Sequence, residues 1–407
     1  MERADVVVVG GGTSGLVSAI CSARAGDRVI LLEKMNEPGK KILASGNGRC
    51  NLLNAGSLRY YGDPGFVEKV MGRDCLEELL TFWRELGLVF RFDSEGRGYP
   101  CTYMSSTVLE VLKGELKRTG VVIRVQERVI AIDRNGQGFA VRTEAGDEFL
   151  SDRLILAAGG AAQPKLGGGT DFWAFLRNSG HRLIGPKPSL TPLIAESRSV
   201  SGLSGIRVKC AVRILTDGIE KHAEQGEVLF TDRGISGICT MQCSRFAEPG
   251  RSECLLNLVY DLFDSADSLR KELFRRRERF ASEPPPTLLR GICAPRLAYA
   301  VCKQAGLALR GEKASELTED QISGIVNCLL EYRIPVTGLE GFDRAQVMAG
   351  GVDCADIHAS NLESRLLPGL HITGEMLNVD GDCGGFNLMF ASVCGLRAGL
   401  NGRKRIK

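Results

Sequence analysis

The stretch that decides the fold of this chain is Ala4-Asp5-Val6-Val7-Val8-Val9-Gly10-Gly11-Gly12-Thr13-Ser14-Gly15. A β-branched run leads into the pattern Gly-x-Gly-x-x-Gly, and residues 16–25 then read as a helix. Residues 28–33 read as a second strand that ends in Glu33. Strand, glycine turn, helix, strand and terminal acid in this order predict a dinucleotide-binding site.

Each part of this pattern has a physical role. Gly10 permits the tight turn, Gly12 lets a pyrophosphate approach the backbone, and Gly15 lets the helix pack closely on the strand. The helix N-terminus offers free N–H groups and the positive end of a dipole to the phosphates. Glu33 can accept a hydrogen bond from a ribose hydroxyl.

Length and composition are those of a globular protein of two or three domains. The chain has 407 residues, is 43% hydrophobic and 25% charged, and carries a formal net charge of +3. Such a small charge gives no indication of a nucleic-acid or anionic-membrane partner, and no apolar run reaches membrane-spanning length. The 14 cysteines occur without a secretory signal or a Cys-x-x-Cys pair. We therefore expect reduced thiols, no metal site and a cytoplasmic protein.

Helical and strand patterns continue along the chain. Residues 66–86 have the spacing of an amphipathic helix, and Ser105 is a plausible start for a second helix that ends at Gly120. The residue pattern changes near residue 186. Strand-like segments at 208–215 and 227–230 are followed by a charged helix over 266–281 and further helices to about 332. A glycine-rich pattern like that of the nucleotide-binding part returns near Val347. We therefore predict that the region between is an insertion.

Three other segments have the composition of a nucleotide site. Residues 38–54 mix glycines, basic residues and amides, which suits wrapping of phosphates and ribityl hydroxyls, with a flexible surface loop as the alternative. The strand over 153–156 breaks into small residues that would let the chain pass close to a cofactor, although a tight turn also explains them. A strand over 370–375 ends in Gly-Glu, and residues 380–385 precede a last helix from about 386 to 400.

The segment from Gly39-Lys40-Lys41 to Gly46-Asn47-Gly48-Arg49-Cys50-Asn51 resembles the signature of the BaiN-like flavoproteins, also called aminoacetone-oxidase-family FAD-binding enzymes. Supporting matches, over almost the whole chain, are residues 96–100, 156–160, 188–193, 226–237, 349–352 and 374–375. The resemblance implies an α/β fold: a three-layer Rossmann-type FAD/NAD(P)-binding domain with an inserted small β-barrel and a helical subdomain. The implied bounds are 1–188 and 347–407 for the FAD-binding domain, 189–260 and 333–346 for the barrel, and 261–332 for the helices.

The resemblance also implies which residues hold FAD. The pyrophosphate is expected on the glycine turn, the adenosine ribose on Glu33, adenine at the backbone of Val129, a ribityl hydroxyl on Glu375, and the isoalloxazine at the start of the last helix. Glu375 stands where aspartate is commoner, and Ile238 stands where proline is expected. The full set of expected cofactor residues is Gly10, Gly12, Thr13, Ser14, Gly15, Glu33, Lys34, Lys41, Ser45, Gly46, Asn47, Gly48, Arg49, Cys50, Asn51, Val129, Ala158, Gly159, Gly160, Gly374, Glu375, Asp380, Gly384, Gly385, Asn387 and Leu388.

The function implied is that of a cytoplasmic oxidoreductase that passes hydride from NAD(P)H through FAD to a small organic substrate, such as a conjugated steroid or bile-acid ketone. Only one dinucleotide pattern is present, so NAD(P)H is expected to visit as a transient co-substrate. The alternative is a flavoprotein related to tRNA modification, or a sensor without turnover. No catalytic acid or oligomeric state can be assigned from the residues: we expect His181 and His371 to be structural, and His222 and His358 to lie in loops.

Overall fold

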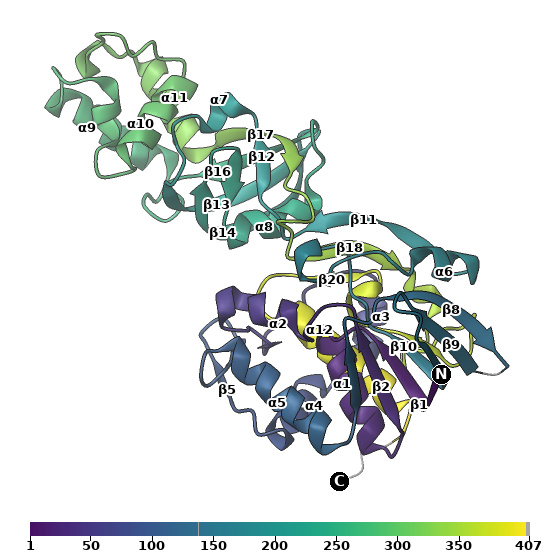
Figure 1. Cartoon of the computed structure of the whole chain (residues 1–407). Coiled ribbons are helices and arrows are strands. Elements are labelled where there is room, and N and C mark those ends of the chain that lie inside the picture. Colours follow the sequence, from purple (N-terminus) through teal and green to yellow (C-terminus); the bar gives the residue numbers. More distant parts are fainter. Residues whose placement is uncertain (137, 404–407) are drawn as a thin grey trace. The chain divides into compact units, whose positions relative to one another are not determined.

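A computed structural model describes residues 1–136 and 138–403 of the chain. Within these residues the chain forms two compact units (Figure 1). The first combines Met1–Pro188 with the segment from Gln346 onward, and the second is Ser189–Ala345. The first unit is therefore interrupted in sequence by the second.

The first unit is built on a mixed sheet that has seven strands in the described part of the chain. Five of them lie parallel in the order β7-β2-β1-β10-β19, and the β8–β9 hairpin adds antiparallel strands beside β10. β1 and β2 are buried almost throughout, as expected for parallel strands covered on both faces. The strands are β1 (Glu2–Val9), β2 (Val29–Glu33), β7 (Val122–Val125), β8 (Val129–Asn135), β9 (Gly138–Thr143), β10 (Glu148–Leu156) and β19 (Leu370–Ile372).

Two helices from opposite ends of the chain pack together beside this sheet. They are α1 (Thr13–Arg24) and α12 (Phe386–Leu400), drawn in purple and yellow in Figure 1. A Cβ atom added to Gly395 would lie 2.6 Å from Cβ of Val17, and one added to Gly399 would lie 2.6 Å from Cβ of Cys21. The two glycines are one helical turn apart, so they let the backbone of α12 approach α1 closely.

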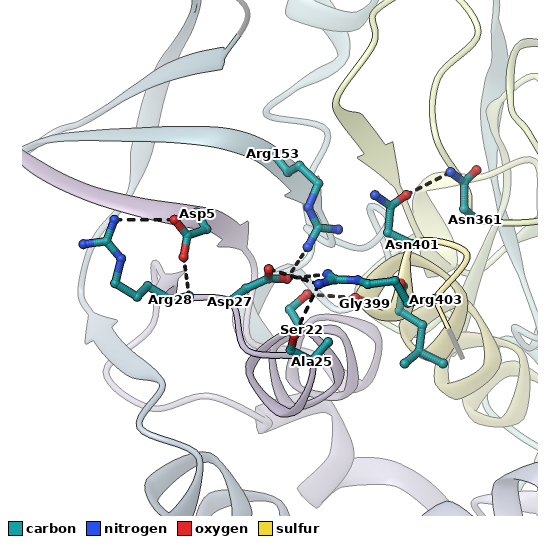
Figure 2. A network of polar contacts seen from close by, with 11 residues as sticks. Asp5, Ser22, Ala25, Asp27, Arg28, Arg153, Asn361, Gly399, Asn401 and Arg403 are labelled. Carbon is teal, nitrogen blue, oxygen red and sulfur yellow. Dashed lines mark hydrogen bonds and ion pairs between the residues drawn. The ribbon is translucent and has the colours of Figure 1, made fainter. Parts of the chain in front are cut away.

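A polar network joins Arg403, which follows α12, to the turn between α1 and β2 (Figure 2). The Asp27 carboxylate accepts hydrogen bonds from Arg153 of β10 and from Arg403, the latter at 2.6 Å. Ser22 Oγ donates to the Gly399 carbonyl at 3.1 Å. Burial lowers the pKa of the Arg153 guanidinium, and the adjacent Asp27 carboxylate opposes that shift. The network holds α12 and α1 in one fixed arrangement.

The remaining elements of the first unit include one correction. The predicted helix over 66–86 is two helices, α3 and α4, because Gly72 between them has φ 67° and ψ −177°, which interrupts the helix. The predicted helix from Ser105 is confirmed as α5. The elements are α2 (Lys40–Ala44), β3 (Leu53–Asn54), β4 (Tyr60–Gly62), α3 (Pro64–Met71), α4 (Cys75–Glu85), β5 (Phe90–Phe92), β6 (Arg97–Pro100), α5 (Ser105–Arg118), α6 (Trp173–Asn178), β11 (Leu183–Ser189), β18 (Val347–Val352) and β20 (Val379–Gly381).

β11 and β18 form a separate ribbon at the point where the chain leaves the first unit and returns. The Asp353 N–H donates to the Arg182 carbonyl, and a Cβ on Gly350 would lie 2.4 Å from the Gly185 oxygen. The pairing is therefore antiparallel. The two ends of the interruption consequently lie beside each other.

The second unit contains a barrel closed by six strands within the described residues, in the order β12-β15-β14-β13-β16-β17. The predicted fold class, a Rossmann-type α/β core with an inserted barrel and helices, is confirmed. The strands are β12 (Leu193–Ala195), β13 (Arg207–Thr216), β14 (Ile219–Phe230), β15 (Gly234–Ser236), β16 (Ser252–Asn257) and β17 (Tyr332–Leu339). The helices are α7 (Ser197–Val200), α8 (Ile238–Cys243), α9 (Ala266–Arg279), α10 (Pro295–Gln304) and α11 (Glu319–Leu330).

Among the residues that the structure describes, no helix is long and apolar enough to cross a membrane. The 14 cysteines are present as thiols, not as disulfides.

Candidate functional site

The carboxyl ends of four parallel strands meet at one edge of the central sheet, where α/β folds bind nucleotides. Gly10–Gly12 follow β1, Glu33 ends β2, residues 157–160 follow β10, and residues 373–375 follow β19. Residues far apart in the sequence are thereby brought into one site.

The three glycines of the turn after β1 differ in what surrounds them. A Cβ on Gly10 would lie 2.4 Å from the Ala157 oxygen, and one on Gly15 would lie 1.9 Å from the Gly10 oxygen. A Cβ on Gly12 would meet nothing within 4 Å. Packing therefore requires glycine at positions 10 and 15, while Gly12 leaves open space at the N-terminus of α1. That space and the adjacent N–H groups fit a pyrophosphate.

Glu33 stabilises the glycine turn by accepting hydrogen bonds on both carboxylate oxygens. Its Oε2 accepts a hydrogen bond from the Gly11 N–H at 2.7 Å, and its Oε1 accepts one from the Met35 N–H at 2.7 Å. An ionised carboxylate can accept about four hydrogen bonds. Both oxygens thus keep acceptor capacity for a ribose hydroxyl.

Neighbouring predicted residues have mainly structural contacts. Lys34 forms an ion pair with Asp171 at 2.6 Å, and Arg128 also contacts that carboxylate at 3.1 Å. Burial tends to raise the pKa of Asp171, but the two cations lower it overall. Val129 is buried at the start of β8. Ser14 donates to Thr373 Oγ1 at 2.6 Å, which joins α1 to the loop after β19.

Glu375 joins three segments of the site. Its Oε1 accepts from the Met348 N–H at 2.8 Å. Its Oε2 accepts from Lys41 Nζ at 2.9 Å and from the Gly160 N–H at 3.2 Å. These bonds hold α2, the loop after β10 and strand β18 around Glu375. The longer side chain at this position therefore has protein partners on both oxygens.

The loop after α2 has a strained backbone. Asn47 and Cys50 both have φ 53°, in the left-handed region that non-glycine residues rarely adopt. Gly46 and Gly48 also have positive φ, and Ser45 Oγ donates to the Ile42 carbonyl at 2.6 Å. Burial raises the pKa of the Cys50 thiol to about 11, so this cysteine is no ready thiolate.

The same loop contains an unsatisfied buried group. Asn51 Oδ1 is buried and has no hydrogen-bond partner among the described residues. A Cβ added to Gly385 would lie 2.7 Å from this oxygen, so the amide faces the start of α12. A buried polar atom without a partner costs free energy unless a ligand or water satisfies it.

The start of α12 is held against the small β3–β6–β5 sheet. Asn54 Nδ2 donates to the Gly384 carbonyl at 2.7 Å, and a Cβ on Gly385 would lie 2.3 Å from the Leu53 oxygen. Asn387 fixes the end of strand β20 by bonding both the N–H and the carbonyl of Gly381 at 2.8 Å. Asp380 is buried in that strand, and Leu388 is partly buried on the helix. The geometry leaves the N-terminus of α12 facing Asn51.

Some site residues were not predicted from the sequence. The site contacts described above include Thr373, Asn54 and Met348. Their roles could not be predicted, because each depends on a partner that is distant in the sequence. The small residues Gly395 and Gly399, four apart in an apolar helix, were a readable signal for the close approach of α1 and α12.

The four histidines differ in burial and in secondary structure. His181 and His371 are buried in the first unit, and burial lowers the pKa of both, that of His371 to about 4. His358 lies outside helices and strands. The prediction of a loop at His222 is wrong: this residue lies within β14, where its ring stacks on Phe246 and contacts Glu224 at 2.8 Å.

The residues present fit a bound FAD. The open space at Gly12 lies where a pyrophosphate would sit, and the unpaired Asn51 oxygen lies in the loop expected to wrap the rest of the molecule. The buried Asn51 oxygen in particular would gain the hydrogen-bond partner it lacks if a ligand lay there.

Comparison with known proteins gives concordant matches. The model of the HI0933-like protein Rossmann domain matches residues 4–401. The chain is 35% identical over 406 residues to a 3-dehydro-bile acid delta(4,6)-reductase of Clostridium scindens, covering 98% of both chains. It is 26% identical over 404 residues to a ribosomal RNA dihydrouridine synthase of Escherichia coli, covering 96% of each. An open flavocytochrome c3 fumarate reductase structure matches the fold at TM-score 0.50 and 16% identity, covering 98% of this chain and 78% of that one.

Proposed function

Since the chain belongs to the family of HI0933-like Rossmann proteins and is an FAD-dependent oxidoreductase, we propose that it reduces a carbon–carbon double bond conjugated to a ketone, with NAD(P)H as reductant. The observation that carries this proposal is the match, at 35% identity over 98% of both chains, to a relative named as a bile-acid reductase. In the net reaction, NAD(P)H loses a hydride and becomes NAD(P)⁺. The double bond gains that hydride at one carbon and a proton at the other.

The chain's own residues would bind and orient the cofactor. FAD supplies the two-electron chemistry when it is bound. The N-terminus of α1 would hold the pyrophosphate at Gly12, and Glu33 would accept from the ribose while it braces the turn. The amide of Asn51 and the N–H groups at the start of α12 would face the ring system. A helix N-terminus there favours negative charge on the bound ring.

The reductant is proposed to bind only in passing. The sequence contains a single Gly-x-Gly-x-x-Gly turn, and that turn is assigned to FAD. A cytoplasmic location is part of the proposal, because it would supply NAD(P)H and keep the 14 cysteine thiols reduced.

The test is anaerobic and uses the purified protein with its flavin. We expect NADH or NADPH to bleach the flavin absorbance and a steroid enone to restore it, with one saturated ketone formed for each NAD(P)H consumed. A saturated 3-ketosteroid is the matched control and should not restore the absorbance. A flavin that is reduced by NAD(P)H but is not reoxidised by any of a panel of enones would contradict the proposal.

A second candidate function rests on a specific observation. The rRNA dihydrouridine synthase relative covers 96% of the chain, so reduction of a uridine ring in RNA has the same full-length support at lower identity. Uracil also contains a double bond conjugated to a carbonyl. Reoxidation of the reduced flavin by rRNA that lacks dihydrouridine, but not by steroid enones, would favour this candidate.

A further inference from the structure

The small antiparallel sheet beside α12 has one face with an unusual set of side chains. Arg91 of β5 lies directly opposite Tyr99 of β6, so both side chains lie on the same face. The ring of Tyr99 contacts that of Tyr103, with centroids 5.6 Å apart. Arg49, from the strained loop after α2, lies close enough for its charge to act on the Tyr99 hydroxyl. We call Arg49, Arg91, Tyr99 and Tyr103 the tyrosine face.

The two arginines of the tyrosine face are exposed and available. Neither guanidinium has a hydrogen bond or ion pair to any residue that the structure describes. Arg97, on the same face, is different, because Asp93 binds its Nε at 2.9 Å and Glu95 contacts its guanidinium. Carboxylates close to this sheet thus neutralise Arg97 and leave Arg49 and Arg91 unpaired.

Tyr103 combines an unfavourable backbone conformation with an exposed side chain. Its φ is 51°, which is unfavourable for a bulky residue, yet its side chain is 46% exposed and gains little from burial. The next residue, Met104, is 55% exposed. Strain at an exposed aromatic residue is typical of ligand-binding surfaces.

The tyrosine face adjoins the start of α12. The stem of Arg97 lies within 3.7 Å of a Cβ position on Gly384, and Asn54 of β3 bonds the Gly384 carbonyl. Tyr99 is two residues further along β6, about 7 Å away. A ligand on Tyr99 would therefore extend from the helix end where the proposed function places the reacting ring.

We propose that the tyrosine face binds the substrate and selects a flat, apolar ring system that carries a negative charge far from its conjugated ketone. Tyrosine rings contact flat apolar surfaces well, and arginine binds carboxylates with paired hydrogen bonds. A steroid acid has both features. This inference rests on the proposed function and adds the substrate class to it.

The experiment compares one substrate in two charge states. Holoenzyme is photoreduced, so that no nicotinamide is needed, and reoxidation is followed with a steroid-acid enone and with its methyl ester. The variant Arg91→Gln, at a residue outside the expected FAD site, should raise the half-saturating concentration of the acid about five-fold, because one charge pair is lost. The ester should change less than about two-fold. Arg84→Gln, which removes an exposed charge from α4, is the matched control and should change neither.

A second variant tests the apolar part of the face. Tyr99→Leu should raise the half-saturating concentrations of acid and ester alike, about ten-fold. The FAD content of Arg91→Gln, Tyr99→Leu and Arg84→Gln, and their rates of flavin reduction by NAD(P)H, should equal those of the wild type.

The outcomes separate this inference from the proposed function. If wild-type flavin is reoxidised by no enone, the proposed function fails, and binding is then read from the change in flavin absorbance on titration with the acid. If the acid is reduced or bound but Arg91→Gln treats acid and ester alike, the inference is wrong. It is also wrong if the variants lose FAD, slow only the nicotinamide step, or impair only reoxidation by rRNA.

Discussion

At the scale of single residues, the glycine turn separates fold from function. Gly15 has no room for a Cβ atom, whereas Gly12 has open space around it, although both belong to the same sequence pattern. A pattern alone does not distinguish the two roles. The structure does so because each position has different neighbours.

We predict opposite outcomes for substitutions at these two glycines. Gly12→Val should fold with a loss of less than about 1 kcal/mol, since nothing in the protein obstructs it, but it should purify without FAD. Gly15→Ala should lose about 3 kcal/mol or more, since its Cβ would overlap the Gly10 carbonyl. Urea unfolding and flavin absorbance measure the two effects. A Gly12→Val protein with a full complement of FAD would show that the pyrophosphate lies elsewhere.

His371 predicts a pH dependence of stability. Its pKa is about 4 in the folded chain, because it is buried, against 6.5 for an exposed histidine. The unfolded chain therefore binds the proton more readily. As far as His371 is concerned, the free energy of unfolding is at its maximum above pH 6.5. It falls as the pH falls towards 4, by on the order of 3 kcal/mol in total.

The variant His371→Asn should flatten this dependence. Between pH 7 and pH 5 the wild type should lose about 2 kcal/mol more than the variant, as measured by urea unfolding. His358→Asn, at a partly exposed position outside regular elements, is the control and should follow the wild type. Parallel curves for wild type and His371→Asn would show that another group titrates.

At the scale of elements, apolar periodicity predicted the helices better than their breaks. The last helix, residues 386–400, and the helix from Ser105 are confirmed as predicted. The break at Gly72 was missed because apolar residues keep a helical spacing on both sides of it. β14 runs from residue 219, not 227, because its first half has too few apolar side chains to show a strand pattern. The ion pairs of Glu375 with Lys41 and of Lys34 with Asp171 could not be predicted, since the two partners in each pair are more than a hundred residues apart.

A pair of glycine-to-alanine changes tests this account of the α3–α4 break. Gly72→Ala should cost about 1–3 kcal/mol, because its backbone conformation is almost restricted to glycine. Gly114→Ala, inside α5 with open space around it, should instead stabilise the protein by about 0.5–1 kcal/mol. The comparison of midpoints in urea measures both. A stabilised Gly72→Ala protein would mean that α3 and α4 can join into one helix.

At the scale of the whole molecule, the described contacts favour an FAD unit that is complete without the interruption. We propose that residues 1–188 and 347–407 form the FAD-binding domain, with the barrel at 189–260 and 333–346 and the helices at 261–332. The strands β11 and β18 are antiparallel neighbours, so the interruption leaves and returns at one place. A short Gly-Ser linker in place of residues 190–345 should therefore give a folded protein that still binds one FAD. The flavin content and a cooperative unfolding transition would test this, and an insoluble or flavin-free product would contradict it.

The discontinuity of the first unit also has a consequence for how a ribosome makes this protein. Strand β19 and helix α12, which pack on β10 and α1, are synthesised only after the whole interruption. At roughly 5–20 residues per second, about 150 intervening residues delay them by roughly 10–30 s. During that time the nascent sheet has β10 paired with β1 but not with β19, and α1 lacks α12. The barrel unit emerges complete while the first unit is still unfinished, and the proposed FAD site is not complete until α12 has been made.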